Sequence, residues 1–299
     1  MAAAPAMIEK PLSISVEGSV GRPSGDSHGG TLHVGKVEPG AAIQDQQLVA
    51  IMASSLHSPP IPAHEELAIQ GVLSIVAANG GEQHLSELMK QGFRAANRAV
   101  RADIEAGGIT EVEGVAMLAL LTRGKYATLG LVGPDRAYLM RANRLTQLTR
   151  DQRVVRARSR RKQDLAEQQA QPASASPVQL LGEQERLDSR SPAIFEITLL
   201  PEDRLGLLSR GILDLFPEER IEAAFGSSAY QGAGMLTEIQ AQTSGAPMMA
   251  ALLQVGPSRD TQVYAPAGME QARSWWPVLF LILIAALSAI AAGVYFVAL

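Results

Sequence analysis

The stretch Gly130-Leu-Val-Gly-Pro-Asp-Arg-Ala-Tyr-Leu-Met140 decides how the middle of this chain folds. Two apolar runs of strand length flank a turn at 133–135, a pattern that predicts two strands joined by a tight connection. Similar short runs occupy 114–121, 125–132, 136–141 and 145–148, and turn-forming residues separate them. We therefore expect a β meander over 114–148.

Helical periodicity marks two longer stretches upstream of this meander. Apolar residues recur at helical spacing over 65–78 and 85–104, and a pair of glycines follows each stretch. Shorter periodic runs predict two more helices, at 217–224 and 234–242. Further strands are expected at 12–16, 47–52, 194–199, 205–209 and 248–255. This order of elements indicates an α+β fold with layered sheets.

Three segments lack such periodicity. Residues 1–31 are rich in Gly, Pro and Ser, and we expect them to be mostly disordered. Residues 153–190 begin with a basic run and continue in Gln, Ala, Ser and Pro, which predicts an exposed, flexible flap within a domain over 32–256. That basic run either is drawn to anionic lipid or is simply solvated, and we favour the second. Residues 257–274 are interpreted as a linker.

The C-terminal segment 275–299 has the features of a membrane-spanning helix. No charged residue occurs from 277 to 299, and at about 1.5 Å per residue this length reaches about 34 Å, enough to cross a hydrocarbon core of about 30 Å. The residues that mark its two ends are Trp275, Trp276 and Pro277 at the start and Tyr295 and Leu299 at the finish. Aromatic residues at both ends are typical of the two membrane interfaces. A buried core helix is the alternative, and its lack of a polar face disfavours it.

Topology follows from the charges around this segment. Arg273 is the last charged residue before it, so the positive-inside bias places the preceding chain in the cytoplasm. The first residues do not resemble a signal peptide, because Glu9 and Lys10 interrupt the apolar start. We therefore predict a single-pass protein with a C-terminal anchor and a cytoplasmic domain.

Composition excludes several classes of function. The net charge of −4 gives no indication of nucleic-acid binding. The chain has no cysteine, which excludes disulfides, thiolate catalysis and cysteine-based zinc sites. The histidines do not have ligand spacing, so we interpret them as ordinary loop or surface residues rather than metal ligands; those considered are His33, His57 and His64.

Three runs, 114–121, 130–140 and 144–151, resemble the PPM family of metal-dependent protein serine/threonine phosphatases. That family has a Val-Gly-Asp-Ser-Arg-Ala-Tyr hairpin and a Leu-Thr-x-Asp-His motif. Here Pro134-Asp135 replaces Asp-Ser, and Gln152 stands in place of the histidine. Residues 194–213 are similar to the family's strand, turn, strand and Ser-Asp-Gly-Leu motif. The resemblance spans roughly 34–255 and implies a sandwich of two antiparallel sheets with helices outside.

The resemblance also implies where metal ligands would lie. In the family, acidic side chains hold two Mg²⁺ or Mn²⁺ ions that activate a water and clamp the phosphoryl oxygens. The corresponding positions in this chain are Gln44, Asp45, Ala53, Arg210 and Ala246. Four of them lack a carboxylate, and no Asp or Glu lies between Asp45 and Glu65. We therefore predict a degenerate site with no catalytic residue, no metal and no cofactor.

The remaining candidate residues have two interpretations each. Arg210 either binds a phosphate group or fills the vacated site and pairs with a carboxylate such as Asp45; we favour the pairing. Four acidic residues are candidate catalytic carboxylates, but turn chemistry and a solvated surface explain them more simply; they are Asp135, Asp151, Asp203 and Asp214.

The sequence thus predicts a membrane-anchored pseudophosphatase, a regulatory or scaffold protein in serine/threonine phospho-signalling. Its expected partners are the membrane and a protein kinase or a phosphoprotein, with no nucleic acid. One alternative is a divergent but active phosphatase that uses Mg²⁺ or Mn²⁺. Another is a purely structural membrane module.

Overall fold

The computed structural model describes residues 13–21, 30–37, 47–55, 61–79, 83–107, 114–154, 176–178, 180–187, 191–237 and 248–256. All of them fall in the first of the chain's two units, Met1–Pro266. The predicted linker 257–274 and membrane helix 275–299 lie outside these ranges. Within the ranges, no helix combines the length and the apolar character that crossing a membrane requires.

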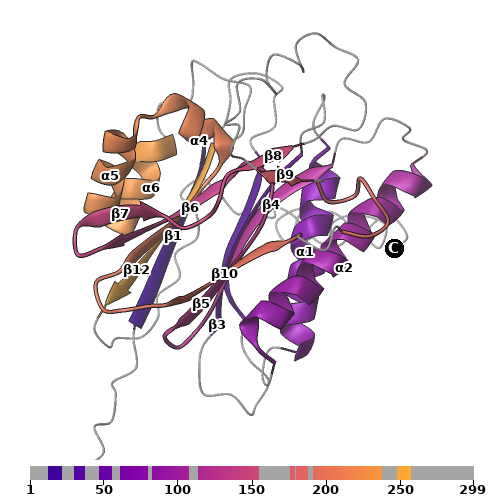
Figure 1. Cartoon of the computed structure of the whole chain (residues 1–299), viewed down its shortest axis with the longest axis horizontal. Helices are drawn as coiled ribbons and strands as arrows, with labels where there is room; N and C mark the ends of the chain where they lie inside the picture. The colour runs from indigo at the N-terminus through magenta and orange to yellow at the C-terminus, as the bar shows by residue number, and fades with distance from the viewer. Residues whose placement is uncertain are drawn as a thin grey trace, which may run out of the picture. The chain divides into compact units, whose positions relative to one another are not determined.

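Two antiparallel five-stranded sheets form the centre of this unit (Figure 1). Sheet A has the order β1 (Ser13–Gly21), β12 (Met248–Gly256), β11 (Arg204–Leu208), β6 (Arg136–Arg141), β7 (Arg144–Gln147). Sheet B has the order β10 (Ala193–Thr198), β5 (Tyr126–Val132), β4 (Val115–Arg123), β3 (Gln47–Ser55), β2 (Thr31–Val37). A short parallel pair joins β8 (Gln152–Val154) to β9 (Ser176–Val178).

Helices cover the outer face of each sheet, which gives four layers (Figure 1). Helices α1 (Pro62–Asn79) and α2 (Leu85–Ala106) pack on sheet B. Helices α4 (Arg210–Leu215), α5 (Glu218–Gly226) and α6 (Ala229–Thr237) pack on sheet A. The predicted fold class, two antiparallel sheets flanked by helices, is confirmed for the described residues.

The continuous apolar run of β3 follows from this layering. Leu48, Ala50 and Met52 lie in the core between the two sheets. Val49 and Ile51 alternate with them and pack against α1 and α2. Because both faces of the strand are covered, alternation between apolar and polar residues disappears from the sequence. Each such side chain contributes about 1.5–3 kcal/mol when it is fully buried.

The predicted meander over 114–148 is divided between the two sheets. Strands β4 and β5 pair within sheet B, whereas β6 and β7 pair within sheet A. The chain crosses from one sheet to the other in the turn 133–135, where Gly133 has φ +122. Local pattern predicts the strands correctly, but it carries no information about which sheet receives each one.

Two expectations about unstructured segments need correction. Within the segment 1–31, which was expected to be mostly disordered apart from a strand at 12–16, strand β1 extends to Gly21 and pairs with β12 along its whole length. Part of the predicted flap 153–190 is packed rather than exposed, because Leu180 and Leu181 are only 2% and 0% exposed in the core beside α2. In both cases pairing with residues far away in the sequence orders a stretch whose own composition is polar.

Candidate functional site

One end of the sandwich brings together several residues singled out in the sequence. Val132 ends β5 in sheet B and Arg136 begins β6 in sheet A, so the turn 133–135 connects the two sheets at this end. Arg136 pairs with Leu208, the last residue of β11, so the junction between β11 and α4 lies beside that turn. We call this region the turn end; it comprises the turn 133–135, the Ser209-Arg210 junction and the side chains in contact with them.

Asp135 is the buried carboxylate of the turn end, with 2% of its surface exposed. Its Oδ1 accepts a hydrogen bond of 2.9 Å from the backbone N–H of Arg210, while its Oδ2 is buried without a hydrogen-bond partner. Burial raises the pKa of Asp135 to about 6, against the opposing effects of the Arg210 N–H and the Arg210 charge. Asp135 therefore changes its charge near neutral pH and is not the solvated turn residue that the sequence suggested.

Arg210 directs its side chain along its own helix. Its Nε donates to Oδ1 of Asp214 at 2.7 Å, an ion pair between residues one helical turn apart with both side chains partly exposed. Pairing with a carboxylate was the preferred interpretation, and Asp214 is a partner the sequence did not suggest; Asp45 lies outside the described residues. Ser209 fixes the start of α4 by accepting a hydrogen bond from the backbone N–H of Met249 at its Oγ.

Residues of the hairpin motif and of the segment that follows β7 brace the same turn. Arg136 donates from Nε and Nη2 to the two carboxylate oxygens of Asp151, at 2.7 and 2.8 Å. The Oε1 of Gln152 accepts a hydrogen bond of 2.8 Å from the backbone N–H of Gly133. Thr149 accepts the backbone N–H of Ala137. These contacts assign Asp151 and Gln152 to holding the turn between the sheets.

Ala53 faces away from the space between the sheets. It packs with Val49 and Ile51 against α1 and α2, because side chains of a strand alternate between its two faces. The neighbouring position on the inter-sheet side of β3 is Ser54, which follows Met52 and is 4% exposed. Next to Ala53, the inter-sheet face of β3 therefore carries a hydroxyl group rather than a carboxylate. Gln44 and Ala246 lie outside the described residues.

Other candidate residues lie elsewhere and have structural partners. Asp203 is buried near the opposite end of the β11 strand, where Arg141 donates to both of its carboxylate oxygens at 2.8 and 2.6 Å. His64 is buried and its Nε2 lies 3.1 Å from Oδ2 of Asp103, which ties α1 to α2. Burial lowers the pKa of His33. His57 lies outside the described ranges.

Sequence reasoning overlooked Glu65, a buried carboxylate at the start of α1. Its Oε1 accepts the backbone N–H of Ser55 and its Oε2 accepts the Thr31 hydroxyl, both at 2.7 Å. Thr31 pairs with Ala53 in the β2–β3 register, so Glu65 binds on the helix side of sheet B. It anchors the ends of two strands to α1 rather than contributing to the turn end.

Comparisons with known proteins give a fold but no sequence relative. No protein-family model matches the sequence, and no curated protein sequence matches it significantly. The catalytic domain of the phosphatase PstP, in complex with two manganese ions, matches with a TM-score of 0.60 at 20% identity, over 82% of this chain and 99% of that domain. The chain has the fold of PPM-type serine/threonine phosphatases.

Two further solved structures support the PPM fold. MsPP, a PPM Ser-Thr phosphatase from Mycobacterium smegmatis in complex with cacodylate, matches with a TM-score of 0.58 at 17% identity, over 85% of this chain and all of that one. PppA, a key regulatory component of T6SS in Pseudomonas aeruginosa, matches with a TM-score of 0.57 at 18% identity, over 84% of this chain and all of PppA. The family resemblance noted in the hairpin is thus reflected in the whole described fold.

Within the PPM fold, the described residues of the turn end provide few ionisable groups. Its described residues supply one buried carboxylate, Asp135, and the ion pair of Arg210 with Asp214. Across the described ranges, no group of three or more His, Asp or Glu side chains is placed to hold a metal ion. The arrangement can take up and release one proton near neutral pH, and it can present a guanidinium group to an anion.

Proposed function

We propose that this chain is a membrane-anchored pseudophosphatase that acts as a regulatory or scaffold protein in serine/threonine phospho-signalling. The observation that carries the proposal is Arg210. Its flanking residues match the family's Ser-Asp-Gly-Leu motif, and an arginine replaces the acidic ligand that the family has at this position of the motif. A cation at this position opposes the binding of two divalent cations, since like charges repel strongly in a partly buried site.

The donor chemistry of the neighbouring positions supports the same proposal. Two hard cations require several oxygen ligands with enough negative charge to balance them. Ser54 on β3 offers a neutral hydroxyl, and the buried carboxylate of the turn end, Asp135, already binds the backbone N–H of Arg210. The described side chains at the turn end do not fit a pair of Mg²⁺ or Mn²⁺ ions, so no hydrolytic step is assigned to them.

Anchoring and regulation rest on different observations. The uncharged segment 277–299 with tryptophans before it supports a single-pass anchor with the domain in the cytoplasm. Regulation is supported by the fold, which this chain shares with PppA, a key regulatory component of T6SS in Pseudomonas aeruginosa. A phosphatase fold without hydrolysis would retain a binding surface for a protein kinase or a phosphoprotein, and the anchor would raise its local concentration at the membrane.

A phosphatase assay on the whole chain tests this proposal. The 299-residue protein, purified in mild detergent, is assayed against a phosphothreonine peptide with and without Mn²⁺, alongside the catalytic domain of PstP as a positive control. We expect no metal-dependent hydrolysis by this chain. Calorimetric titration with Mn²⁺ on the same sample should give no binding of two ions.

The divergent active phosphatase makes the opposite prediction. Manganese-stimulated turnover that disappears in Asp135→Asn would show that the turn end is catalytic and would overturn the proposal. Turnover that persists in that variant would point to a contaminating phosphatase. Further purification should then remove the activity from wild type and variant alike.

A further inference from the structure

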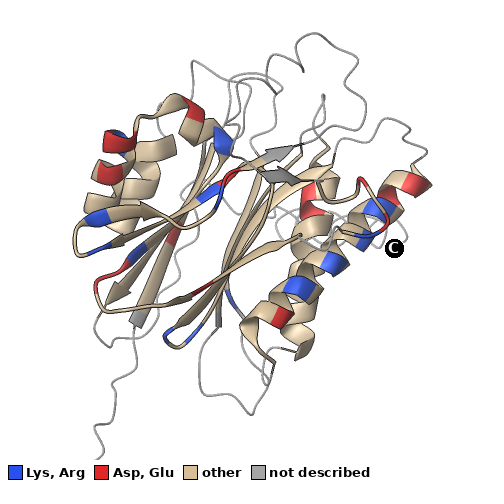
Figure 2. Ribbon diagram, viewed as in Figure 1, with Lys and Arg blue, Asp and Glu red and all other residues tan. Residues whose placement is uncertain are grey.

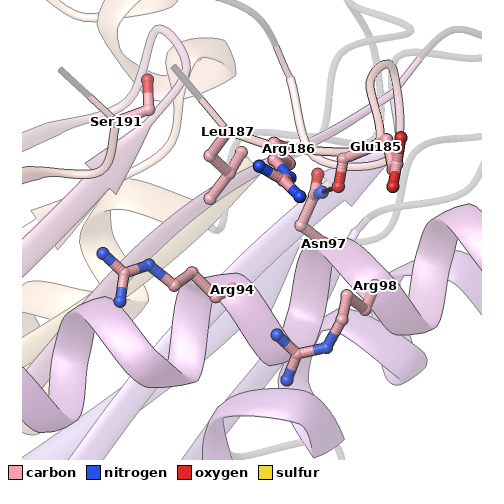
Figure 3. A pocket seen from close by; sticks show the side chains of 7 residues that line it. All are labelled: Arg94, Asn97, Arg98, Glu185, Arg186, Leu187 and Ser191. Atoms are coloured by element: carbon pink, nitrogen blue, oxygen red, sulfur yellow. Dashed lines mark hydrogen bonds between the residues drawn. The ribbon is translucent and has the colours of Figure 1, made fainter. Parts of the chain in front are cut away.

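A second polar site lies along α2 and shares no residue with the turn end. A cavity of about 500 Å³ opens between this helix and a facing part of the chain that comprises residues 185–187 and 191 (Figure 3). Arg94, Asn97 and Arg98 line it from the helix, and four residues line it from the facing part of the chain: Glu185, Arg186, Leu187 and Ser191. Figure 3 shows the side chains of both elements around the same space.

The facing segment is held firmly against the helix. Asn97 is 2% exposed, accepts the backbone N–H of Gly182 at 2.9 Å and donates to the carbonyl of Gln184 at 3.0 Å. Arg101 donates to the carbonyl oxygens of Gly182 and Glu183. Because these hydrogen bonds fix the backbone, the wall that carries Arg186 is preorganised before any ligand arrives.

Three arginines and one glutamate, Glu185, line this cavity, so its charges are unbalanced. Arg94 and Arg98 lie one helical turn apart on one face of α2, and Arg186 lies across from them. Among the described residues none of these three forms an ion pair, whereas Arg101 on the same helix pairs with Glu105 at 2.6 Å. Like charges four residues apart on a helix repel each other. An anion between the three guanidinium groups would remove that repulsion.

We infer that this cavity binds the phosphate group of a phosphorylated serine or threonine side chain. A guanidinium offers parallel N–H donors that match phosphate oxygens in pairs, and charge-assisted bonds of this kind are about twice as strong as neutral ones. Three such groups supply enough donors for a dianion. Leu187 adds an apolar contact for the carbon atoms that carry the phosphate.

An extended anionic membrane fits the same surface less well. Acidic residues surround the arginines, with Glu87 toward one end of α2, Asp103 and Glu105 toward the other, and Glu185 at the cavity. Figure 2 shows basic positions in the middle of this helix and acidic ones toward both ends. A lipid surface would bring negative charge against all of these carboxylates, while a single phosphate in the cavity would face three arginines and one carboxylate, Glu185.

This inference rests on the proposed function, which includes a phosphoprotein partner, and it assigns that partner to a site that shares no residue with the turn end. It is tested on the 299-residue protein in mild detergent, by fluorescence anisotropy with a labelled degenerate mixture of phosphoserine peptides and with its unphosphorylated counterpart. The variant is Arg94→Glu with Arg98→Glu. The matched control is Arg144→Glu with Arg150→Glu, two exposed arginines that follow β6 and β7 of sheet A and change the net charge equally.

We expect the phosphorylated mixture to bind, and the Arg94/Arg98 variant to weaken binding by about tenfold or more, which is about 1.4 kcal/mol. The control pair should change it by less than about twofold. Inorganic phosphate should compete with the peptide. Replacing both arginines by glutamine provides a milder variant if the charge reversal lowers the melting temperature.

Three results would overturn the assignment. The first is equal binding by wild type and both arginine variants. The second is equal binding of phosphorylated and unphosphorylated peptides. The third is binding to vesicles of phosphatidylserine, but not to peptides, that depends on Arg94 and Arg98, which would assign the surface to a membrane instead. None of these readouts involves hydrolysis, so failure here is distinguishable from failure of the pseudophosphatase proposal.

Discussion

At the scale of single residues, Asp135 has the strongest consequence for stability. Its folded-state pKa of about 6 lies above the ordinary value of 3.8 because the carboxyl is buried. Between these two values the folded protein holds a proton that the unfolded chain has released. The resulting stabilisation is complete below pH 3.8 and is lost as the pH rises through 6.

We therefore predict that Asp135→Asn stabilises the domain at pH 8 by about 1–3 kcal/mol, since the amide keeps an acceptor for the Arg210 N–H but carries no charge. The gain should vanish as the pH falls toward 4. Urea unfolding of residues 1–266, followed by circular dichroism for wild type and variant at both pH values, measures the difference. A difference that is the same at both values would contradict the buried-charge explanation.

The role of Asp135 could not be predicted from its local sequence. A Gly-Pro-Asp turn is typical of an exposed connection, and the sequence was interpreted in that way. Burial arises because Arg210, distant by 75 positions, brings the start of α4 over the turn. Arg210 itself was recognised from its flanking motif, but its partner Asp214 and the brace from Gln152 depend on geometry that only the folded chain defines.

At the scale of elements, α1 and α2 pack closely through a glycine. A Cβ added to Gly71 would lie 2.5 Å from both the Cα and the backbone nitrogen of Ala96 on α2. Backbone atoms cannot move aside as a flexible side chain would, so the helices must separate. Gly234 on α6 provides a matched control, because a Cβ there would meet nothing within 4 Å.

We predict that Gly71→Ala destabilises the domain by about 1–3 kcal/mol through overpacking. Gly234→Ala should instead be neutral or stabilise it by up to about 1 kcal/mol, because alanine is the better helix former. Thermal unfolding of both variants of residues 1–266 checks the pair. Equal effects would mean that helix propensity, rather than the contact with Ala96, determines the outcome.

Elements differ in how well the sequence predicts them. The amphipathic α2 and the apolar strands β3, β4 and β5 were predicted closely, because burial imposes a strong local pattern. Strand β1 was predicted only over 12–16, where Ile14 and Val16 alternate with polar residues; its continuation to Gly21 was missed, since the glycines and serines that follow indicate disorder. Its order comes from pairing with β12 at the other end of the domain, a contact that no local pattern encodes.

At the scale of the whole molecule, the proposed anchor would determine the location of the domain independently of any activity in it. A helix at 275–299 would hold the domain at the membrane even with no catalysis in it. Residues 1–266 form a unit of their own, so the anchor should be removable without loss of the fold. Local concentration would then be the property that truncation changes.

We predict that the 299-residue chain stays with membranes after alkaline carbonate extraction, and that residues 1–266 appear in the supernatant with an unchanged circular dichroism spectrum for the domain. A finer variant places arginine at Leu287, the middle of the segment, which costs about 2.5–3.5 kcal/mol of insertion free energy. This change should release part of the protein, whereas Leu287→Ile should not. Extraction of the unmodified chain by carbonate would refute the anchor, while the domain's fold and its turn end would be unaffected.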